Sequence, residues 1–295
     1  EKVDTERIKR LLPTFIISFG VVLWFLLGYR SPAIAGLWGI ALAILFSMLQ
    51  GKYRPTRKQM YDAIQEGFYL VAILSLLLVA VGPLGQVMLT TNLSGRLGSA
   101  LVQYLPDTQL ILLIGAMIVS LILGMGLPTP VAYIIVALAL VPFMQQIGIP
   151  ALQAHFFVFY FAVFSTLTPP VAVSVLAAAK LGEASFLSTA KDAIKIALTT
   201  FIIPFAFVFS PELMTFPDVT VKTFIAIAEV IFVQVAVSVA SYGFLFRSLN
   251  GVERGGYTIV ALSGFLGFTY DTNFWYVAVT LFFAMSGYVY MTKKA

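Results

Sequence analysis

Charge and cysteine are scarce in this 295-residue sequence. It has no cysteine, one histidine (His155) and only 11% charged residues, while 60% of its residues are apolar. The absence of cysteine excludes a disulfide framework and a thiolate metal site. With a single imidazole, no transition-metal site is expected. A soluble domain carries about 25% charged residues, so this composition excludes a soluble globular enzyme and predicts a protein embedded in a membrane.

Long apolar runs predict the fold class, an all-α polytopic membrane protein. Runs of roughly 15–25 residues have the length at which a helix spans a bilayer. An outer-membrane barrel would instead show segments of about ten residues with alternating polarity. The runs cover residues 11–27, 33–49, 68–89, 109–123, 131–147, 154–179, 193–209, 220–246, 256–268 and 274–291.

Basic residues predict how these runs are oriented. One cluster lies in residues 1–10 and a second in residues 50–66, where Thr56 is expected to cap an interfacial helix. Only Arg30 lies in the turn between the first two runs. By the positive-inside tendency, both clusters and both ends of the chain face the cytoplasm of a multi-pass inner-membrane protein. The later basic residues expected on that side are Lys180, Lys191, Lys195, Arg247, Arg254, Lys293 and Lys294.

The orientation constrains the middle of the chain. The chain is expected to be outside near Asp107 and inside near Lys180, so it crosses the membrane an odd number of times between them. Three full spans satisfy this condition, and so does a re-entrant hairpin (109–147) followed by one broken helix (154–180). Each hairpin arm reaches about 22–26 Å at 1.5 Å per residue. This is short of the roughly 30 Å hydrocarbon core, so the spacing favours the hairpin.

Two stretches interrupt the apolar runs, GMGLPTP at residues 124–130 and STLTPP at residues 165–170. Prolines remove helical N–H donors and free upstream carbonyls. Irregular backbone at membrane depth is tolerated only where it is buried in protein or lines a cavity. Simple kinking of ordinary helices is the alternative interpretation.

The chemistry expected at these breaks is ion and anion binding. Freed carbonyls beside hydroxyl groups suit a hard cation such as Na⁺. Helix N-termini expected near Val131 and Val171 suit an anionic group of a substrate, as in secondary transporters with paired broken helices. The hydroxyl groups beside the breaks belong to Thr129, Ser165, Thr166 and Thr168.

Three motifs occur in order: GMGLPTPVAY at residues 124–133, HFFVFYF at 155–161 and TPPV at 168–171. Together they resemble the second half of the large membrane subunit of TRAP transporters, which are tripartite ATP-independent periplasmic transporters. The GLPTP variant and the HFFVFYF run resemble the fused 4TM/12TM permeases of the TAXI branch. The resemblance covers roughly residues 68–214.

The resemblance implies an elevator-type fold with inverted repeats, each holding a re-entrant hairpin and a discontinuous helix. It implies Na⁺ symport of a small organic acid that a periplasmic substrate-binding protein delivers, with Na⁺ as coupling ion and no organic cofactor. The implied sodium-binding residues are Gly124, Gly126, Thr129, Ser165, Thr168 and Val171. The implied substrate-binding residues are Thr129, Thr166, Thr168 and Ser174.

The break departs from the family pattern at two positions. Other branches read TPPVGxN, whereas here Ala172 stands for the glycine and Ser174 for the asparagine. We therefore expect an acid different from that of the sialic-acid branch.

The resemblance also implies a division of the chain. Residues 1–66 would hold a basic cytoplasmic segment, a scaffold helix pair and a connector. Residues 67–214 would form the transport repeat, and residues 215–295 additional transmembrane helices. A first repeat is not recognisable before Glu66 and the chain starts at Glu1, so we expect a C-terminal half whose partner repeat is missing, cleaved or a separate chain. The other expected partners are the binding protein and the bilayer, not nucleic acid.

Two other functions remain as alternatives. A passive channel could also use glycine- and proline-rich breaks. An intramembrane protease would need a Ser–His pair or two membrane aspartates, and the sequence offers only His155 and the loop residue Asp271, so no enzyme is expected. Glu229 is costly in lipid unless it faces protein or water, and its candidate partners are Lys222 and Gln234.

Overall fold

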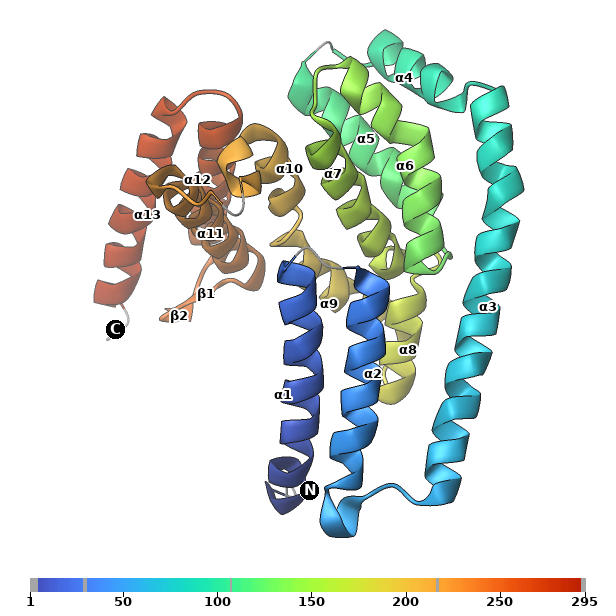
Figure 1. The fold of residues 1–295 in the computed structure, drawn as a ribbon. Coiled ribbons are helices and arrows are strands. Elements are labelled where there is room, and N and C mark those ends of the chain that lie inside the picture. The colour runs from blue at the N-terminus through green and yellow to red at the C-terminus, as the bar shows by residue number, and fades with distance from the viewer. Residues whose placement is uncertain (1–4, 29–30, 107, 216–217, 293–295) are drawn as a thin grey trace. The chain divides into compact units, whose positions relative to one another are not determined.

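The computed structural model describes residues 5–28, 31–106, 108–215 and 218–292 (Figure 1). Within these ranges the chain is almost entirely helical, and six helices are long and apolar enough to cross a membrane. This confirms the predicted all-α polytopic fold. The expected marker residues Lys2, Arg30, Asp107, Lys293 and Lys294 lie outside the described residues.

Short turns connect most of the helices, and two strands of two residues form a small antiparallel hairpin. In chain order the elements are α1 (Thr5–Leu27), α2 (Pro32–Met48), η1 (Gly51–Tyr53), α3 (Arg57–Thr90), α4 (Leu93–Tyr104), α5 (Gln109–Gly124), α6 (Thr129–Gln146), α7 (Ala151–Phe164), η2 (Ser165–Leu167), α8 (Val173–Leu181), α9 (Phe186–Leu198), α10 (Ile202–Phe209), η3 (Pro211–Met214), α11 (Val221–Tyr242), β1 (Phe244–Leu245), β2 (Arg247–Ser248), α12 (Gly251–Thr269) and α13 (Asn273–Met291).

The chain divides into two compact units, Glu1–Leu76 and Leu77–Ala295. In the first unit, α1 and α2 pack side by side. A Cβ atom on Gly39 would lie 2.5 Å from Cγ2 of Val22, so only glycine permits this close approach. At the other end of the pair, Gln50 Nε2 donates a hydrogen bond to Thr14 Oγ1 at 2.7 Å.

Helix α3 begins as the sequence predicts but continues further. The Gln59 amide donates to Thr56 Oγ1 at 3.3 Å, and the Thr56 amide donates to Gln59 Oε1 at 2.9 Å. This reciprocal cap confirms Thr56 as the N-cap residue. From this cap α3 runs unbroken from Arg57 to Thr90, and its expected place at the membrane interface stays a prediction. No proline interrupts it before Pro83, so the capped segment and the third apolar run form one helix.

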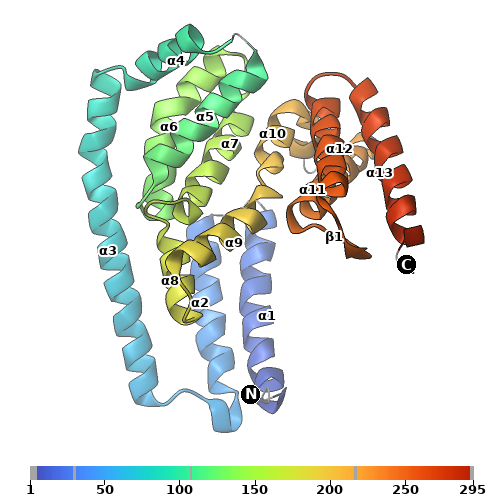
Figure 2. The ribbon, with the colours of Figure 1, turned by 180° about the vertical axis from the view of Figure 1, so that it is seen from behind.

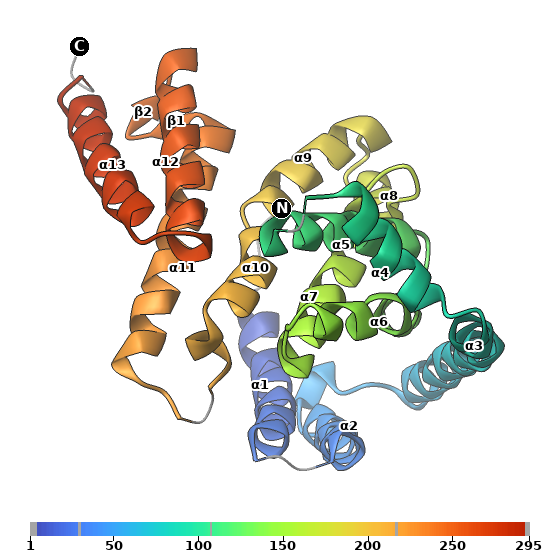
Figure 3. The same ribbon diagram turned by 90° about the horizontal axis from the view of Figure 1, so that it is seen from above.

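The core of the second unit lies among α5, α6, α7 and α10 (Figure 2). Helix α6 packs against α4, α5 and α7, and Figure 3 shows α4 lying over α5 and α6. Phe157 and Phe161 are fully buried and meet Phe205 of α10, with ring centroids 5.3 and 6.0 Å apart. Phe157 and Phe161 of the aromatic run at 155–161 therefore contribute to packing of the core.

A bundle of α11, α12 and α13 follows, with α12 packed between the other two (Figure 3). Arg247 binds the Glu253 carboxylate through two hydrogen bonds, of 2.6 and 3.0 Å. The same guanidinium donates to Thr292 Oγ1 just after α13, at 2.9 and 3.2 Å. Glu253 also accepts from the Asn250 amide at 2.8 Å, so the Arg247–Glu253 pair links the β-hairpin, the start of α12 and the residue after α13.

The Arg247–Glu253 pair predicts a pH-dependent stability. The adjacent guanidinium, aided by the Asn250 amide, lowers the pKa of the Glu253 carboxyl below its ordinary value of 4.5. Its stabilising contribution is therefore complete above about pH 4.5 and is lost as the pH falls through the lowered pKa. We expect Glu253→Gln, which keeps the helix cap, to lower the thermal unfolding midpoint by a few degrees at pH 7 and by much less at pH 3.

Thermal unfolding of the detergent-purified chain at both pH values measures this effect. Glu6→Gln is the matched control, because the Lys52–Glu6 pair is exposed and such pairs contribute little. Equal losses for Glu253→Gln at the two pH values would contradict the prediction.

Candidate functional site

The first predicted break is present between α5 and α6. Helix α5 ends at Gly124, α6 begins at Thr129, and Gly126 between them has a φ of +76°. Left-handed backbone of this kind favours glycine. Helix α6 starts two residues earlier than the expected Val131, because Pro130 lies in its first turn, where its missing N–H costs nothing. Whether the α5–α6 pair is re-entrant stays a prediction.

The second predicted break separates α7 from α8. Helix α7 ends at Phe164, a 3₁₀ turn covers Ser165–Leu167, and α8 begins at Val173. The helix starts later than the expected Val171, because Ala172 adopts left-handed backbone with a φ of 38°. The family pattern has glycine at this position, and glycine there indicates left-handed backbone. This signal was not used in the sequence analysis.

Hydroxyl groups at the second break donate to carbonyls of the preceding turns. Ser165 Oγ donates to Ala162 O at 2.6 Å, and Thr166 Oγ1 donates to Val163 O at 2.9 Å. Thr168 Oγ1 donates to Phe164 O at 3.0 Å. Each hydroxyl proton is thus used in a hydrogen bond to a backbone carbonyl. Each hydroxyl oxygen keeps lone pairs that can accept a hydrogen bond or coordinate an ion.

The structure brings the two breaks into contact. Gly124 packs on Ser165, where a Cβ atom would lie 2.5 Å from Ser165 Oγ, and the Ser165 side chain is fully buried. Gly126 faces Val171, with 3.2 Å between its virtual Cβ and Val171 Cγ1. Four of the predicted site residues therefore meet at one place, although they come from stretches about 40 residues apart in the sequence.

The other predicted site residues lie around this contact on the same elements. Ser174 Oγ, in the first turn of α8, donates to Thr166 Oγ1 at 3.1 Å. Thr129 is the first residue of α6 and its side chain makes no hydrogen bond within the described residues. Thr168 contacts its own preceding turn, and no hydrogen bond joins it to Thr129 in that part of the chain. The atoms at the two breaks that could coordinate an ion are therefore mainly neutral oxygens. Such a set of ligands suits a hard cation.

Three other residues considered from the sequence lie away from the contact between the two breaks. The Tyr133 hydroxyl is 2.9 Å from His155 Nδ1, which fixes the histidine against α6. Asp271 accepts from the Asn273 amide at 2.9 Å, as a turn residue does. Glu229 is half-buried on α11 and has neither an ion pair nor a hydrogen bond within the described ranges, so the expected partners do not reach it. The described residues also contain no group of three or more His, Asp or Glu side chains able to hold a metal.

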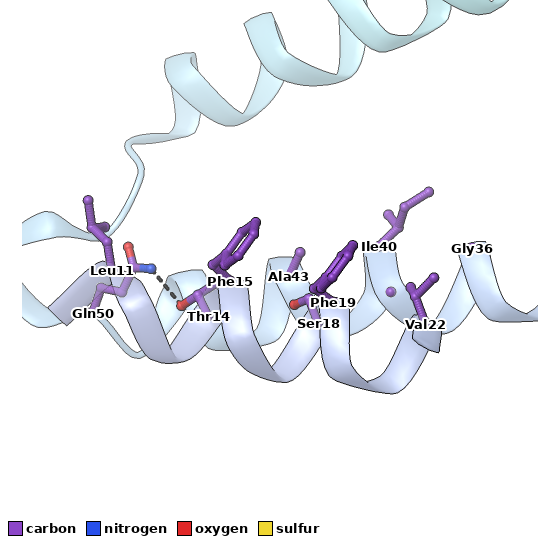
Figure 4. Close-up of a pocket in the computed structure, with 11 residues that line it drawn as sticks. Leu11, Thr14, Phe15, Ser18, Phe19, Val22, Gly36, Ile40, Ala43 and Gln50 are labelled. Atoms are coloured by element: carbon purple, nitrogen blue, oxygen red, sulfur yellow. Dashed lines mark hydrogen bonds between the residues drawn. The ribbon is translucent and has the colours of Figure 1, made fainter. Parts of the chain in front are cut away.

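A separate apolar groove of about 520 Å³ lies between α1 and α2 in the first unit (Figure 4). Its walls include Phe15, Phe19 and Ile40, and the Gln50–Thr14 hydrogen bond lies at one end. The groove offers few polar atoms, so it provides no site for an ion.

Paired interrupted helices in a polytopic helical protein define a class, the secondary transporters, whose binding sites lie at such interruptions. A family model described as "Tripartite ATP-independent periplasmic transporter, DctM component" matches residues 2–219. The chain belongs to this family, the large membrane component of TRAP transporters, which confirms the resemblance and points to a transporter rather than an enzyme. Searches of curated proteins and of solved structures returned no significant match.

The contact between the breaks predicts a clear difference between two glycine substitutions. Gly124→Ala would place a methyl group against buried Ser165, so we expect a loss of about 1–3 kcal/mol of stability. Gly67→Ala in α3 meets no atom within 4 Å and is expected to be neutral or stabilising by up to about 1 kcal/mol. Thermal unfolding in detergent measures both, and equal effects of the two substitutions would be evidence against the contact.

Proposed function

We propose that this chain is part of a Na⁺-coupled secondary transporter that imports a small carboxylate delivered by a periplasmic substrate-binding protein. Membership of the tripartite family supports the transport class and the existence of partner components. The observation that carries the proposal further is the contact of the two helix breaks, Gly124 with Ser165 and Gly126 with Val171.

The proposed sodium ligands are oxygen atoms at this contact. Ser165 and Thr168 hold their hydroxyl protons on backbone carbonyls, so their oxygens present lone pairs to a cation. Backbone carbonyls near Gly124, Gly126 and Val171, with the hydroxyl of Thr129, supply further donors of the same hard type. Because all of these are neutral, the bound ion keeps its charge available to attract an anionic substrate.

The proposed substrate site lies beside the ion. Helices α6 and α8 begin at Thr129 and Val173, and helix N-termini carry partial positive charge that stabilises a carboxylate. The hydroxyl pair of Thr166, in the 3₁₀ turn, and Ser174, in the first turn of α8, offers polar contacts to the same group. Thr129 and Thr168 would line both sites, which couples the binding of ion and acid.

The assembly proposed around the site follows the expected division of the chain. Residues 67–214 carry both breaks as one transport repeat, residues 1–66 act as scaffold, and residues 215–295 add helices. A matching repeat comes from the same permease or from a separate chain, and the repeats together work by an elevator movement. From the basic residues we infer that both ends of this chain lie in the cytoplasm. The TAXI-type permeases are the branch of the family to which we assign it.

Substitution of Thr168 tests sodium coupling. In proteoliposomes holding the complete permease and its binding protein, Thr168→Ala removes a proposed ligand and should raise the Na⁺ concentration for half-maximal uptake on the order of tenfold. Thr168→Ser keeps the hydroxyl and should stay close to the unmodified protein. Gly126→Ala should abolish most uptake, because alanine is strained at a φ of +76°.

The uptake assay separates the proposal from its alternatives. Uptake of a radiolabelled carboxylate that is indifferent to the Na⁺ gradient and is unaffected by Thr168→Ala and Gly126→Ala would falsify sodium coupling. Unitary current steps without substrate would indicate a passive channel instead.

A further inference from the structure

An apolar cavity of about 630 Å³ lies in the second unit, walled by α5, the end of α9, α10, α11 and α12. Cavities that hold small ligands measure roughly 300–1,000 Å³. Phe205 and Ala261 form a buried part of the wall, with 5% and 7% of their surfaces exposed. Leu198 and Leu262, at 45% and 58%, are exposed along its rim. The cavity is therefore mainly apolar, with hydroxyls only at Ser241 and Thr258 among its lining residues, and it has an exposed rim.

Its surroundings limit what can fill it. Helices α9–α10 and α11, which form two of its walls, are among those long and apolar enough to span a membrane, so a surrounding bilayer would supply hydrocarbon to its exposed rim. Apolar cavities do not hold water well, because water finds no polar partners there. A hydrocarbon chain from the bilayer matches both the lining and the access.

The hydroxyl groups of this cavity lie at one end, near the C-terminal end of α11, and two cations outside its lining lie close by: Arg254 binds α11 carbonyls of lining residues, and Lys195 is one turn before the lining residue Leu198. Arg254 Nε donates to Ala240 O at 3.0 Å and Nη2 donates to Ser241 O at 3.1 Å, and both of these residues line the cavity. Thr258, which also lines it, lies one turn after Arg254 on α12. Lys195 Nζ lies 4.6 Å from the ring centroid of Tyr242, the residue after Ser241.

The charge at this end is positive. Within the described residues, Arg254 and Lys195 form no ion pair, although Asp192 is one turn from Lys195 on the same helix. Arg247, seven residues before Arg254, is already neutralised by Glu253. Arg254 uses two of its donors on α11 carbonyls, and its remaining guanidinium N–H groups make no hydrogen bond in the described part of the chain.

We propose that this cavity binds an anionic phospholipid, with an acyl chain between α10, α11 and α12 and the phosphate at Arg254 and Lys195. Free guanidinium donors bind phosphate oxygens through charge-assisted hydrogen bonds. Basic pockets between membrane helices recognise anionic headgroups in this way. The charge excess selects an anionic lipid over a zwitterionic one, while the apolar walls hold either kind of acyl chain.

The test measures which lipid stays with the purified protein. The full chain is reconstituted in equal amounts of phosphatidylglycerol and phosphatidylcholine, extracted in mild detergent, and its retained lipids are quantified by mass spectrometry. Phosphatidylglycerol should be enriched. Lys195→Gln and Arg254→Gln should each lower the retained ratio by about fivefold, since one cation near a headgroup has an effect of that order.

Three further variants serve as controls. Arg57→Gln with Lys58→Gln removes two exposed cations at the start of α3 and should leave the ratio unchanged. Arg254→Lys keeps the charge and should retain most of the selectivity, which separates lipid binding from the role of Arg254 in capping α11. Thr258→Phe narrows the cavity and should reduce retention of both lipids together.

Two outcomes would overturn the proposal. One is a ratio that Lys195→Gln leaves unchanged while the protein elutes as a single folded species. The other is retention of both lipids that Thr258→Phe does not reduce, which would mean that the cavity is filled by something else. Neither outcome bears on sodium-coupled uptake, so the two proposals stand or fail separately.

Discussion

Backbone carbonyls at the two helix breaks determine much of the chemistry of this protein. At membrane depth an unpaired carbonyl has no water to bind, so a broken helix survives only where other donors replace the lost N–H groups. At the second break the hydroxyls of Ser165, Thr166 and Thr168 supply those donors. The residues that make the break tolerable are thus the ones whose oxygens remain available to a ligand. The same hydroxyl groups therefore stabilise the break and offer oxygen atoms to a ligand.

Glycine provides the second requirement, close approach between interrupted segments. Gly124 lies against Ser165, and any side chain there would force the breaks apart. The same device recurs away from the site, where Gly39 admits Val22 and Gly98 admits the ring of Phe143. Between membrane helices close packing must come from shape, because lipid is as apolar as the side chains. The glycines therefore determine how near the oxygen donors of the two breaks can come.

Local signals in the sequence predicted local features well. Proline and glycine located both breaks, and Thr56 located the start of α3, because each acts through its own backbone bonds. The sequence did not predict that the breaks touch, since that contact depends on how α5 and α7 pack around a shared core. The left-handed conformation of Ala172 was missed because alanine carries no local sign of it. The Asn250–Glu253 capping box was readable from its spacing, and the hydrogen bond from Arg247 to Thr292 was not.

This chain has few charged residues, so each of them has a large effect on the charge of its surroundings. The family match ends at residue 219, so the bundle of α11–α13 lies beyond the matched region, while α5, α9 and α10 on the other side of the cavity lie within it. In that bundle Glu253 neutralises the charge of Arg247. The pair connects the start of α12 to the end of α13, because Arg247 also bonds Thr292. Arg254 and Lys195 are left with positive charge at the end of an apolar cavity. In a medium of low dielectric such charge attracts an anion strongly, and the anion that a membrane supplies beside an acyl chain is a phospholipid headgroup.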